Sequence, residues 1–364
     1  MDFETQKTYQ LALNFIKGLG PSTYVNLIEE FGSAEAIFNL KEEELKPFIS
    51  GKKVLKSILE KSSLTRAESE YKYCQKHGIK ILSYSDKDFP KRILYYDNTP
   101  RLLFFRGNAD LNSHKIVSMV GTRGATERGK VHCQKIVESL VEHNCLISSG
   151  LAYGVDIAAH KMALRFGLPT VGVVAHGLDD LYPGEHASTA TKMLDNGGIL
   201  TEFPSQTEMV RELFPMRNRI VASMCDALIV VESAVKGGSL ITANFANEYG
   251  KDVFAIPGRP NDEFSEGCNL LIKSHRAHMY EGHKDLEYIM RWGKPTKVKQ
   301  GKLFPELTES QTDIIHCIRH KGECHIDEIS KITERPSSKL AADLLQLELK
   351  GLIKSIAGKR YICI

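Results

Sequence analysis

Three glycine-bearing turns along the chain could hold a negatively charged group. They are residues 120–124, 148–154 and 236–242, and each follows an apolar segment. Glycine lets the backbone approach a ligand closely, and N–H groups at the start of a helix can bind phosphate. In the first turn, Arg123 adds a guanidinium whose geometry suits phosphate oxygens. One such turn is a weak signal, but three in succession predict a row of backbone donors.

A second cluster, residues 214–219, combines an aromatic ring with two arginines and an asparagine. Phe214 can stack on a base, while Arg217 and Arg219 can neutralise phosphates and Asn218 can hydrogen-bond a base edge. The alternative is that both arginines form ion pairs that hold the helix after them, since arginines are common at surfaces. The composition of the cluster favours contact with nucleic acid.

One set of residues resembles a hydrolytic trio. Asp156 and His160 are four residues apart and would share a helix face, and Ser149 precedes them. However, Asp156 is also the natural N-cap of a helix over residues 157–166, and Ser149 lacks the G-x-S-x-G turn of an exposed nucleophile. We therefore expect no catalysis here.

A second set could bind metal. It comprises His316, Cys317, His320, Cys324 and His325, and His316 and His320 lie one helical turn apart. No pair of cysteines has the short spacing of a zinc finger. Cys317 is expected in the core of its domain, so we predict no metal site.

The elements that must position these residues alternate in type. Short apolar runs separate helical stretches such as residues 129–143 and 157–166, which is typical of a parallel sheet covered on both faces. Strands are predicted at residues 79–83, 102–105, 115–120, 145–149, 170–175, 198–200, 227–231 and 252–256. The fold class is therefore α/β, a Rossmann-like, doubly wound domain over residues 67–290, with ligands expected at the carboxyl ends of its strands.

Neither nucleotide fingerprint is present. No G-x-G-x-x-G follows the first strand with an acidic residue about 20 positions later, and no G-x-x-x-x-G-K-[ST] occurs. NAD and ATP are thus unsupported as ligands, and no cofactor is expected.

Residues 1–66 are predicted to be helical. Helical spacing over residues 9–16 is broken at residues 18–21, and Ser22 can cap a helix over residues 23–31, with another over 34–40. A helix, a Gly-x-Gly turn and a second helix form a helix-hairpin-helix, whose glycines can present N–H groups to phosphate. We favour a plain helical bundle, because such hairpins also serve as packing modules.

The C-terminal part begins with a basic segment. Residues 291–303 contain five basic and no acidic groups and are interpreted as a tether, with a phosphate-contacting strap as the alternative. Residues 304–364 have the pattern of three helices and a hairpin, the outline of a winged helix. The helix in the recognition position, residues 337–350, has mixed charge, so contact with protein, or an idle module, is at least as plausible as DNA binding.

Composition sets the outer limits. The chain has 364 residues, 42% of them hydrophobic, eight cysteines and a net charge of +3. The low cysteine density indicates a reduced, cytosolic protein, and no secretory signal is visible. Apolar runs are broken by charge within about six residues, so a membrane span is excluded. A net charge this small means that any polyanion site must be built from a few placed groups.

The motifs together resemble those of the DNA-processing protein A family (DprA, also called Smf). The first is Val120-Gly121-Thr122-Arg123, and the second runs from Ser149 to Asp156 with Ala159-His160 after it. The others are residues 177–183, 214–220, 238–243, 256–258 and 267–272. They occur in the family's order and cover roughly residues 75–280, and the flanking helical and winged-helix domains also fit.

The resemblance implies a protein that is not an enzyme. Members bind single-stranded DNA during natural transformation, protect it, help load the recombinase RecA, and form homodimers through the Rossmann-like domain. The positions that match the family's DNA pocket are Gly121, Thr122, Arg123, Phe214, Arg217, Asn218, Arg219, Gly238 and Ser239. From the second glycine turn, Ser149 and Gly150 join the expected DNA-binding site.

The sequence departs from the family pattern at several places. Thr122 replaces the usual Ser and keeps its hydroxyl, while residues 206–210 lack the usual Gly and Pro, so the resemblance predicts no path for that loop. Two other classes of function stay open. One is a nucleoside monophosphate-processing hydrolase of the same superfamily, although its Pro-Gly-Gly-x-Gly-Thr turn is missing at residues 236–240. The other is an interaction scaffold with an idle pocket.

Overall fold

The computed structural model describes residues 3–292, 307–350, 352–356 and 358–363. These residues form two compact units, Met1–Trp292 and Gly293–Ile364, and each is described by itself. Most of the expected basic tether, from residue 293 onward, lies outside the described residues.

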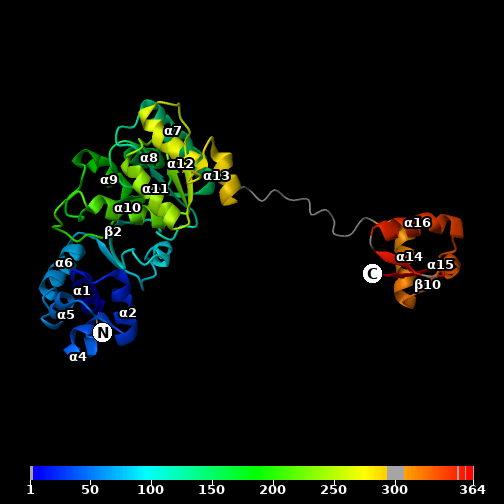
Figure 1. Cartoon of the computed structure of the whole chain (residues 1–364), viewed down its shortest axis with the longest axis horizontal. Helices are drawn as coiled ribbons and strands as arrows, with labels where there is room; N and C mark the ends of the chain where they lie inside the picture. The colour runs from blue at the N-terminus through cyan, green and yellow to red at the C-terminus, as the bar shows by residue number, and fades with distance from the viewer. Residues whose placement is uncertain (1–2, 293–306, 351, 357, 364) are drawn as a thin grey trace. The chain divides into compact units, whose positions relative to one another are not determined.

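The first unit begins with a helical layer, drawn in blue in Figure 1. Its helices are α1 (Phe3–Asn14), α2 (Pro21–Phe31), α3 (Ala34–Phe38), α4 (Glu42–Leu45), α5 (Lys52–Leu59) and α6 (Leu64–Lys76). Buried Leu11, Leu27, Ile37 and Ile58 form its centre. The expected cap of α2 was wrong: Gly20 is the N-cap, because Pro21 already occupies the first turn and places Ser22 inside the helix.

The boundary expected between residues 66 and 67 falls inside α6. Ala67, Tyr71 and Cys74 of this helix belong to the same apolar cluster as α1 and α2. The cluster continues into Leu102 and Phe104 of the sheet. The helical layer therefore shares a core with the first strands of the sheet.

The sheet has nine strands in the order β1-β2-β6-β5-β4-β3-β7-β8-β9. Their bounds are β1 (Lys80–Ser83), β2 (Leu102–Gly107), β3 (Ile116–Val120), β4 (Leu146–Ser149), β5 (Thr170–Val173), β6 (Gly197–Thr201), β7 (Ala227–Val230), β8 (Asp252–Ala255) and β9 (His278–Met279). Along this order every neighbouring pair from β6 to β9 is parallel, whereas β2 pairs antiparallel with both β1 and β6. The eight predicted strands are all present, and the two-residue β9 was missed.

Helices cover both faces of the sheet. They are α7 (Glu127–Leu140), α8 (Val155–Arg165), α9 (Ala187–Met193), α10 (Leu213–Met224), α11 (Gly238–Glu248), α12 (Glu263–Lys273) and α13 (His283–Met290), with short 3-10 turns at Lys91–Tyr95, Val141–His143 and Gly184–His186. One apolar cluster joins α10, α11 and α12 to the sheet, and a second joins α7, α8 and α13 to its other face. This is the expected doubly wound, Rossmann-like arrangement (Figure 1).

The second unit is the expected winged helix. It contains α14 (Glu309–Lys321), β10 (Cys324–His325), α15 (Ile326–Thr333), α16 (Ser337–Leu349), β11 (Ile353–Ile356) and β12 (Arg360–Cys363). The strands form a sheet in the order β10-β12-β11. Cys317 and Cys324 lie in its core with their sulfurs 3.9 Å apart.

Two absences hold for the described parts of the chain. No cluster of three or more metal-ligating side chains is found there, the histidines and cysteines at residues 316–325 included. None of the helices there has both the length and the apolar character that crossing a membrane requires.

Candidate nucleic-acid interface

A cleft of about 660 Å³ lies at the carboxyl edge of the parallel strands. Strands β4, β3 and β7 are parallel neighbours, so the turns after them open on the same side. Nine of the expected site residues line this cleft: Gly121, Thr122, Arg123, Gly150, Phe214, Arg217, Asn218, Gly238 and Ser239. The other two, Ser149 and Arg219, do not.

The turn after β3 is clamped to the start of α8. A Cβ on Gly121 would lie 2.4 Å from Cγ2 of Val155, so only glycine fits. The N–H of Thr122 donates to the Glu232 carbonyl (2.7 Å), and its own carbonyl accepts from the N–H of Val155 (3.2 Å). This clamp leaves Arg123 exposed at the rim, with its guanidinium 5.3 Å from the centre of the Phe214 ring.

Glu232 is a supporting residue that sequence reasoning missed. Its buried carboxylate accepts hydrogen bonds from the backbone N–H (2.9 Å) and hydroxyl (2.5 Å) of Thr126, the N-cap of α7. Gly129 makes room for it, since a Cβ there would lie 2.4 Å from Oε2. The sequence signal that could have identified Glu232 is an acidic residue directly after the apolar run of β7. The backbone carbonyl of Glu232 holds one end of the turn at residues 121–126, and its carboxylate holds the other end.

Arg217 forms the floor of the cleft rather than its rim. Its side chain is only 6% exposed, and its Nη1 donates to the carbonyls of Gly150 and Val173. A Cβ on Gly150 would lie 2.3 Å from that nitrogen. Burial lowers the pKa of Arg217, and the negative charge of Asp156 opposes this effect. Arg217 therefore joins the ends of β4 and β5.

Asp156 is the counter-charge beneath this floor. Its carboxylate accepts from the N–H groups of Gly150 (3.1 Å) and Ala152 (3.4 Å). Burial raises its pKa, and Arg217 and these hydrogen bonds act in the opposite direction. The expectation that Asp156 caps the helix was wrong. Helix α8 begins at Val155 and its N-cap is Gly154, whose φ of 77° suits glycine.

The geometry does not support a hydrolytic trio. Ser149 is fully buried and donates from Oγ to the carbonyl of Met119 (2.6 Å). His160, also fully buried, contacts Oγ1 of Thr170 through Nδ1 (2.7 Å), and its Nε2 has no hydrogen-bond partner among the described residues. Burial lowers the pKa of His160 to about 3. Neither the hydroxyl nor the imidazole is accessible to a substrate.

The buried imidazole predicts a pH dependence of stability. In the unfolded chain His160 takes up a proton near pH 6.5, whereas in the folded chain it does so only near pH 3. The free energy of unfolding should therefore fall as the pH drops through this window. The contribution of His160 between pH 7 and pH 5 is about 2 kcal/mol. Urea denaturation at both pH values should show that loss reduced by this amount in His160→Asn, and an equal loss in both proteins would contradict the assignment.

Arg219 points away from the cleft. Its Nη2 pairs with Glu202, and its Nη1 donates to the carbonyl of Asn98. Burial raises the pKa of Glu202, and Arg219 acts to lower it. Arg219 therefore forms an ion pair, as the alternative interpretation of residues 214–219 expected, and it faces the helical layer instead of the cleft.

The start of α11 forms the opposite wall. Gly237 is its N-cap, Gly238 has open space where a Cβ would be, and the hydroxyl of Ser239 donates to Ser233 (2.7 Å). The first N–H groups of a helix have no partner within the helix, so they are available to an anion in the cleft. Lys236 is exposed beside them.

The charge of the cleft is strongly basic for a chain with net charge +3. Its ionic lining consists of Arg123, Arg211, Arg217, Lys236 and the single acid Asp156. Lys236 belongs to the third glycine turn, residues 236–242, but was not predicted as a site residue. Arg211 was also missed, because its loop has no regular pattern. Tyr182 also lines the cleft, with its ring 6.3 Å from that of Phe214.

Comparison with known proteins agrees with this geometry. Residues 80–290 match the family model for DNA recombination-mediator protein A, and residues 303–359 match the DprA winged helix domain. DNA processing protein DprA of Streptococcus pneumoniae is 38% identical over 52% of this chain and 66% of its own length. Protein Smf of Synechocystis sp. is 28% identical over 98% of both chains.

Solved structures give the same result. The X-ray structure of DprA from Streptococcus pneumoniae superposes with a TM-score of 0.65 at 29% identity, covering 77% of this chain and 97% of that one. A Helicobacter pylori DprA, studied for its single-stranded DNA binding mode, has a TM-score of 0.54 at 27% identity, covering 59% and 96%. The chain therefore belongs to the DNA recombination-mediator protein A family, whose members include DprA and Smf.

Proposed function

We propose that this protein of the DNA-processing family binds single-stranded DNA in the cleft at the carboxyl edge of its sheet. The observation that carries the proposal is the concentration of four basic side chains and the Phe214 ring in one cleft, on a chain that is otherwise nearly neutral. Binding of single strands without sequence preference combines such a basic groove with aromatic stacking. The Helicobacter pylori relative studied for single-stranded DNA binding supports the same assignment.

Each wall of the cleft has a distinct role in this proposal. Arg123, Arg211 and Lys236 are exposed and neutralise phosphates, and the first N–H groups of α11 bind a phosphate oxygen. Phe214, with Tyr182 beside it, offers a ring on which a base stacks. Arg217 fixes the shape of the floor. Asn218 is half-buried in the cleft, and its Oδ1 accepts a hydrogen bond from Nε of Arg217 (3.0 Å).

The proposal extends to what happens to the bound strand. We infer that the protein covers incoming DNA against nucleases, helps load RecA onto it, and works as a homodimer through its Rossmann-like unit. Membership of the family supports these roles. Light scattering of the purified chain tests the dimer, and the rate of RecA filament formation on coated single strands, with and without the protein, tests the loading.

Preference for single strands is the direct test of the binding proposal. At moderate salt, a labelled single-stranded oligonucleotide should bind more tightly than its duplex, because only unpaired bases can stack on Phe214. The affinity of the protein for the single strand should fall as the salt concentration rises. The same incubations with nucleoside monophosphates should release no base or phosphate. Equal or tighter binding of the duplex, or hydrolysis that copurifies with the protein, would contradict the proposal.

The winged helix is expected to lie outside this DNA site. On α16, Asp343 accepts from the hydroxyl of Ser310 (2.5 Å) and Glu348 from the N–H of Ser355 (2.9 Å), so its acids stabilise the domain. Its exposed positions include Leu345 (59%) and Leu349 (80%), which suit a protein partner better than a phosphate. Removal of residues 304–364 should change the affinity for single strands less than about threefold, or ~0.7 kcal/mol. A tenfold loss, with the remaining chain folded and its oligomeric state unchanged, would place the domain in the site.

A further inference from the structure

The rim of the cleft includes a segment that no secondary structure holds. Residues 206–212 lie between β6 and α10, and Met209, Val210 and Arg211 of this segment line the cleft. At its far end the segment joins α10 through hydrogen bonds from the N–H groups of Leu213 and Phe214 to the carbonyls of Val210 and Arg211 (3.2 and 3.3 Å). The path of the segment therefore also depends on the contacts that hold the residue just before it, Ser205.

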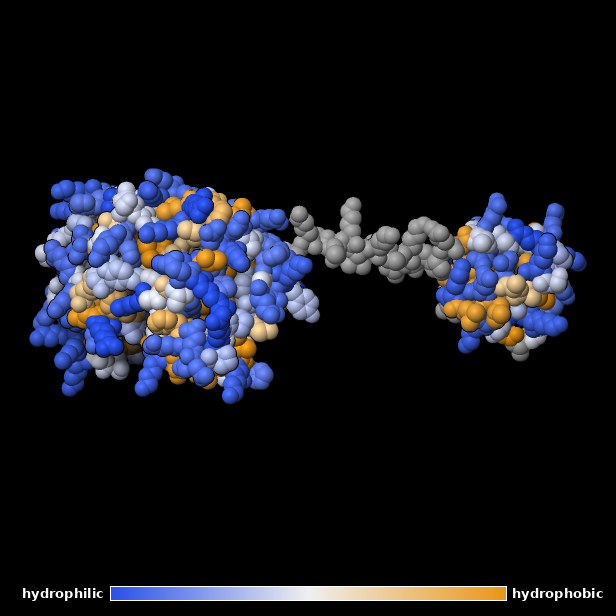
Figure 2. Space-filling view, turned by 90° about the horizontal axis from the view of Figure 1, so that it is seen from above, coloured by the Kyte–Doolittle hydropathy of each residue, from blue (hydrophilic) through white to orange (hydrophobic). Residues whose placement is uncertain are grey.

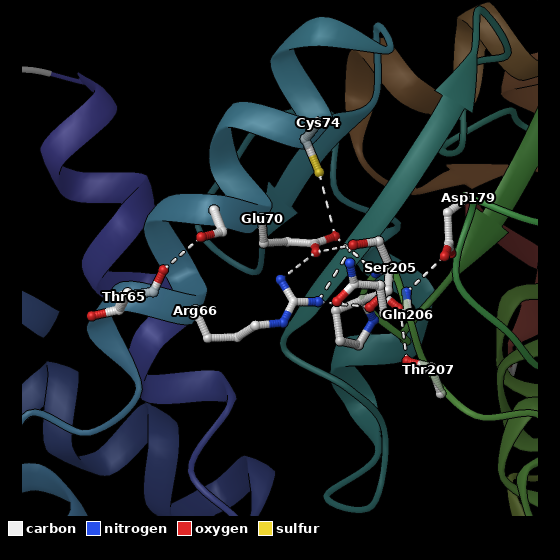
Figure 3. Close-up of polar contacts among 10 residues, drawn as sticks. Thr65, Arg66, Glu70, Cys74, Asp179, Ser205, Gln206 and Thr207 are labelled. Carbon is white, nitrogen blue, oxygen red and sulfur yellow. Dashed lines mark hydrogen bonds and ion pairs between the residues drawn. The ribbon is translucent and has the colours of Figure 1, made fainter.

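Ser205 is held by a carboxylate from the N-terminal helical layer. Glu70 of α6 is 2% exposed, and it accepts from the N–H of Ser205 (2.9 Å) and from its hydroxyl (2.5 Å). Arg66, one turn earlier on α6, donates to Glu70 (2.7 Å) and to the carbonyl of Ser205 (2.6 Å). Figure 3 shows the three side chains converging from two parts of the chain that are about 135 residues apart.

Further contacts support this anchor on both sides. The guanidinium of Arg66 lies 5.5 Å from the ring centre of Phe15, beyond the end of α1. Past Ser205, the N–H of Gln206 donates to Asp179 (2.7 Å), and the hydroxyl of Thr207 donates to the carbonyl of Pro204 (2.6 Å) (Figure 3). These contacts hold the chain on both sides of Ser205, at the point from which the segment continues to Met209 and Arg211.

We propose that Glu70 is a positioning residue for the DNA cleft, acting through Ser205 to fix the segment that presents Arg211. This inference rests on the proposed function, and it makes the N-terminal helical layer part of the binding apparatus without contact between that layer and DNA. Glu70 does not touch the bound strand. Its effect on affinity arises because a freely moving segment must be ordered when DNA binds.

The first experiment measures the segment itself, in the full chain without DNA. Arg211 is the only lysine or arginine between Lys192 and Arg217, so trypsin cleavage after it reports on this segment. We expect Glu70→Gln to increase that cleavage rate at least about threefold. Glu68→Gln, an exposed acid on the same helix, removes the same charge and should leave the rate unchanged. An unchanged rate in Glu70→Gln would overturn the proposal even if the protein binds no DNA.

The second experiment measures coupling in DNA binding. Glu70→Gln should weaken binding of a single-stranded oligonucleotide several-fold. Its effect should be less than multiplicative with Arg211→Ala, because a loose segment already presents Arg211 poorly. With Lys236→Ala, on the opposite wall, the effects should multiply. If Glu70→Gln disturbed the structure in general, it would combine with Arg211→Ala and with Lys236→Ala in the same way. Equal coupling in the two double variants would therefore overturn the positioning role.

Ser205→Ala keeps the test decisive if the change at Glu70 prevents folding. This variant removes one hydrogen bond to Glu70 and retains the backbone N–H that makes the other. It should show the same pattern at smaller amplitude, with about twofold faster cleavage after Arg211. Wild-type cleavage and wild-type DNA affinity in Ser205→Ala would count against the anchor, whereas failure of the wild-type protein to bind any single strand would count against the proposed function alone.

Discussion

Arg217→Ala is expected to lower the free energy of unfolding by about 3–5 kcal/mol, the cost of removing one partner from a buried charge pair. The substitution leaves Asp156 buried without its counter-charge and takes the donor from the carbonyls of Gly150 and Val173. Urea denaturation followed by circular dichroism measures this loss. From sequence, Arg217 was expected to neutralise phosphates at the surface; because it is buried, we expect its loss to weaken the fold first.

The control for this prediction is Arg165→Ala. Arg165 is an exposed arginine at the far end of α8, and its loss should change the free energy of unfolding by less than about 0.5 kcal/mol. If Arg217→Ala unfolds at the same urea concentration as the wild type and yet binds DNA tenfold more weakly, Arg217 acts on phosphate directly. That result would show that Arg217 does not act by stabilising the floor of the cleft.

The sheet and the position of the cleft could be predicted because they follow from local pattern. Strands buried on both faces are continuous apolar runs, and the glycine turns after β3 and β4 and the turn that leads into α11 mark where backbone must approach closely. Topology then brings those turns to one edge without further information. For that reason nine of the expected residues line one cleft.

The direction of individual side chains could not be predicted in the same way. Arg217 and Arg219 are two residues apart on α10, and the roughly 200° between them sends one under the cleft floor and the other toward Glu202. Glu70 gave no signal as a site residue, because its partner Ser205 is distant in sequence. Such contacts depend on how elements pack, which a single sequence does not encode locally.

The helical layer shows the same limit at the level of domains. The predicted pattern changes near residue 66 from helices alone to alternating strands and helices, but α6 is continuous through that point and its apolar face completes the core around α1. A helix that joins two layers is amphipathic like any other. The sequence pattern therefore placed a domain boundary inside this helix and predicted neither the helix nor its shared role.

The largest effect on DNA binding is expected from the variant that combines Arg123→Ala with Lys236→Ala. Both side chains are exposed on opposite walls of the cleft, and each lost contact with a phosphate should cost about 1–3 kcal/mol. The affinity for a single-stranded oligonucleotide should fall about 30-fold or more. Because fewer counterions are released, the slope of log affinity against log salt should also become shallower by about 1.4. Fluorescence anisotropy over a salt series measures both quantities.

A charge-matched control separates contact from the general field of the protein. Lys161 and Arg165 are exposed on the second half of α8, away from the turns that form the cleft, and replacing both with alanine removes the same formal charge. At physiological salt the Debye length is about 8 Å, so an exposed charge farther than this from a phosphate is largely screened from it. The control should therefore keep near-wild-type affinity and salt slope. If both double variants lose affinity equally, the strand is attracted by net charge and the cleft is not where it binds.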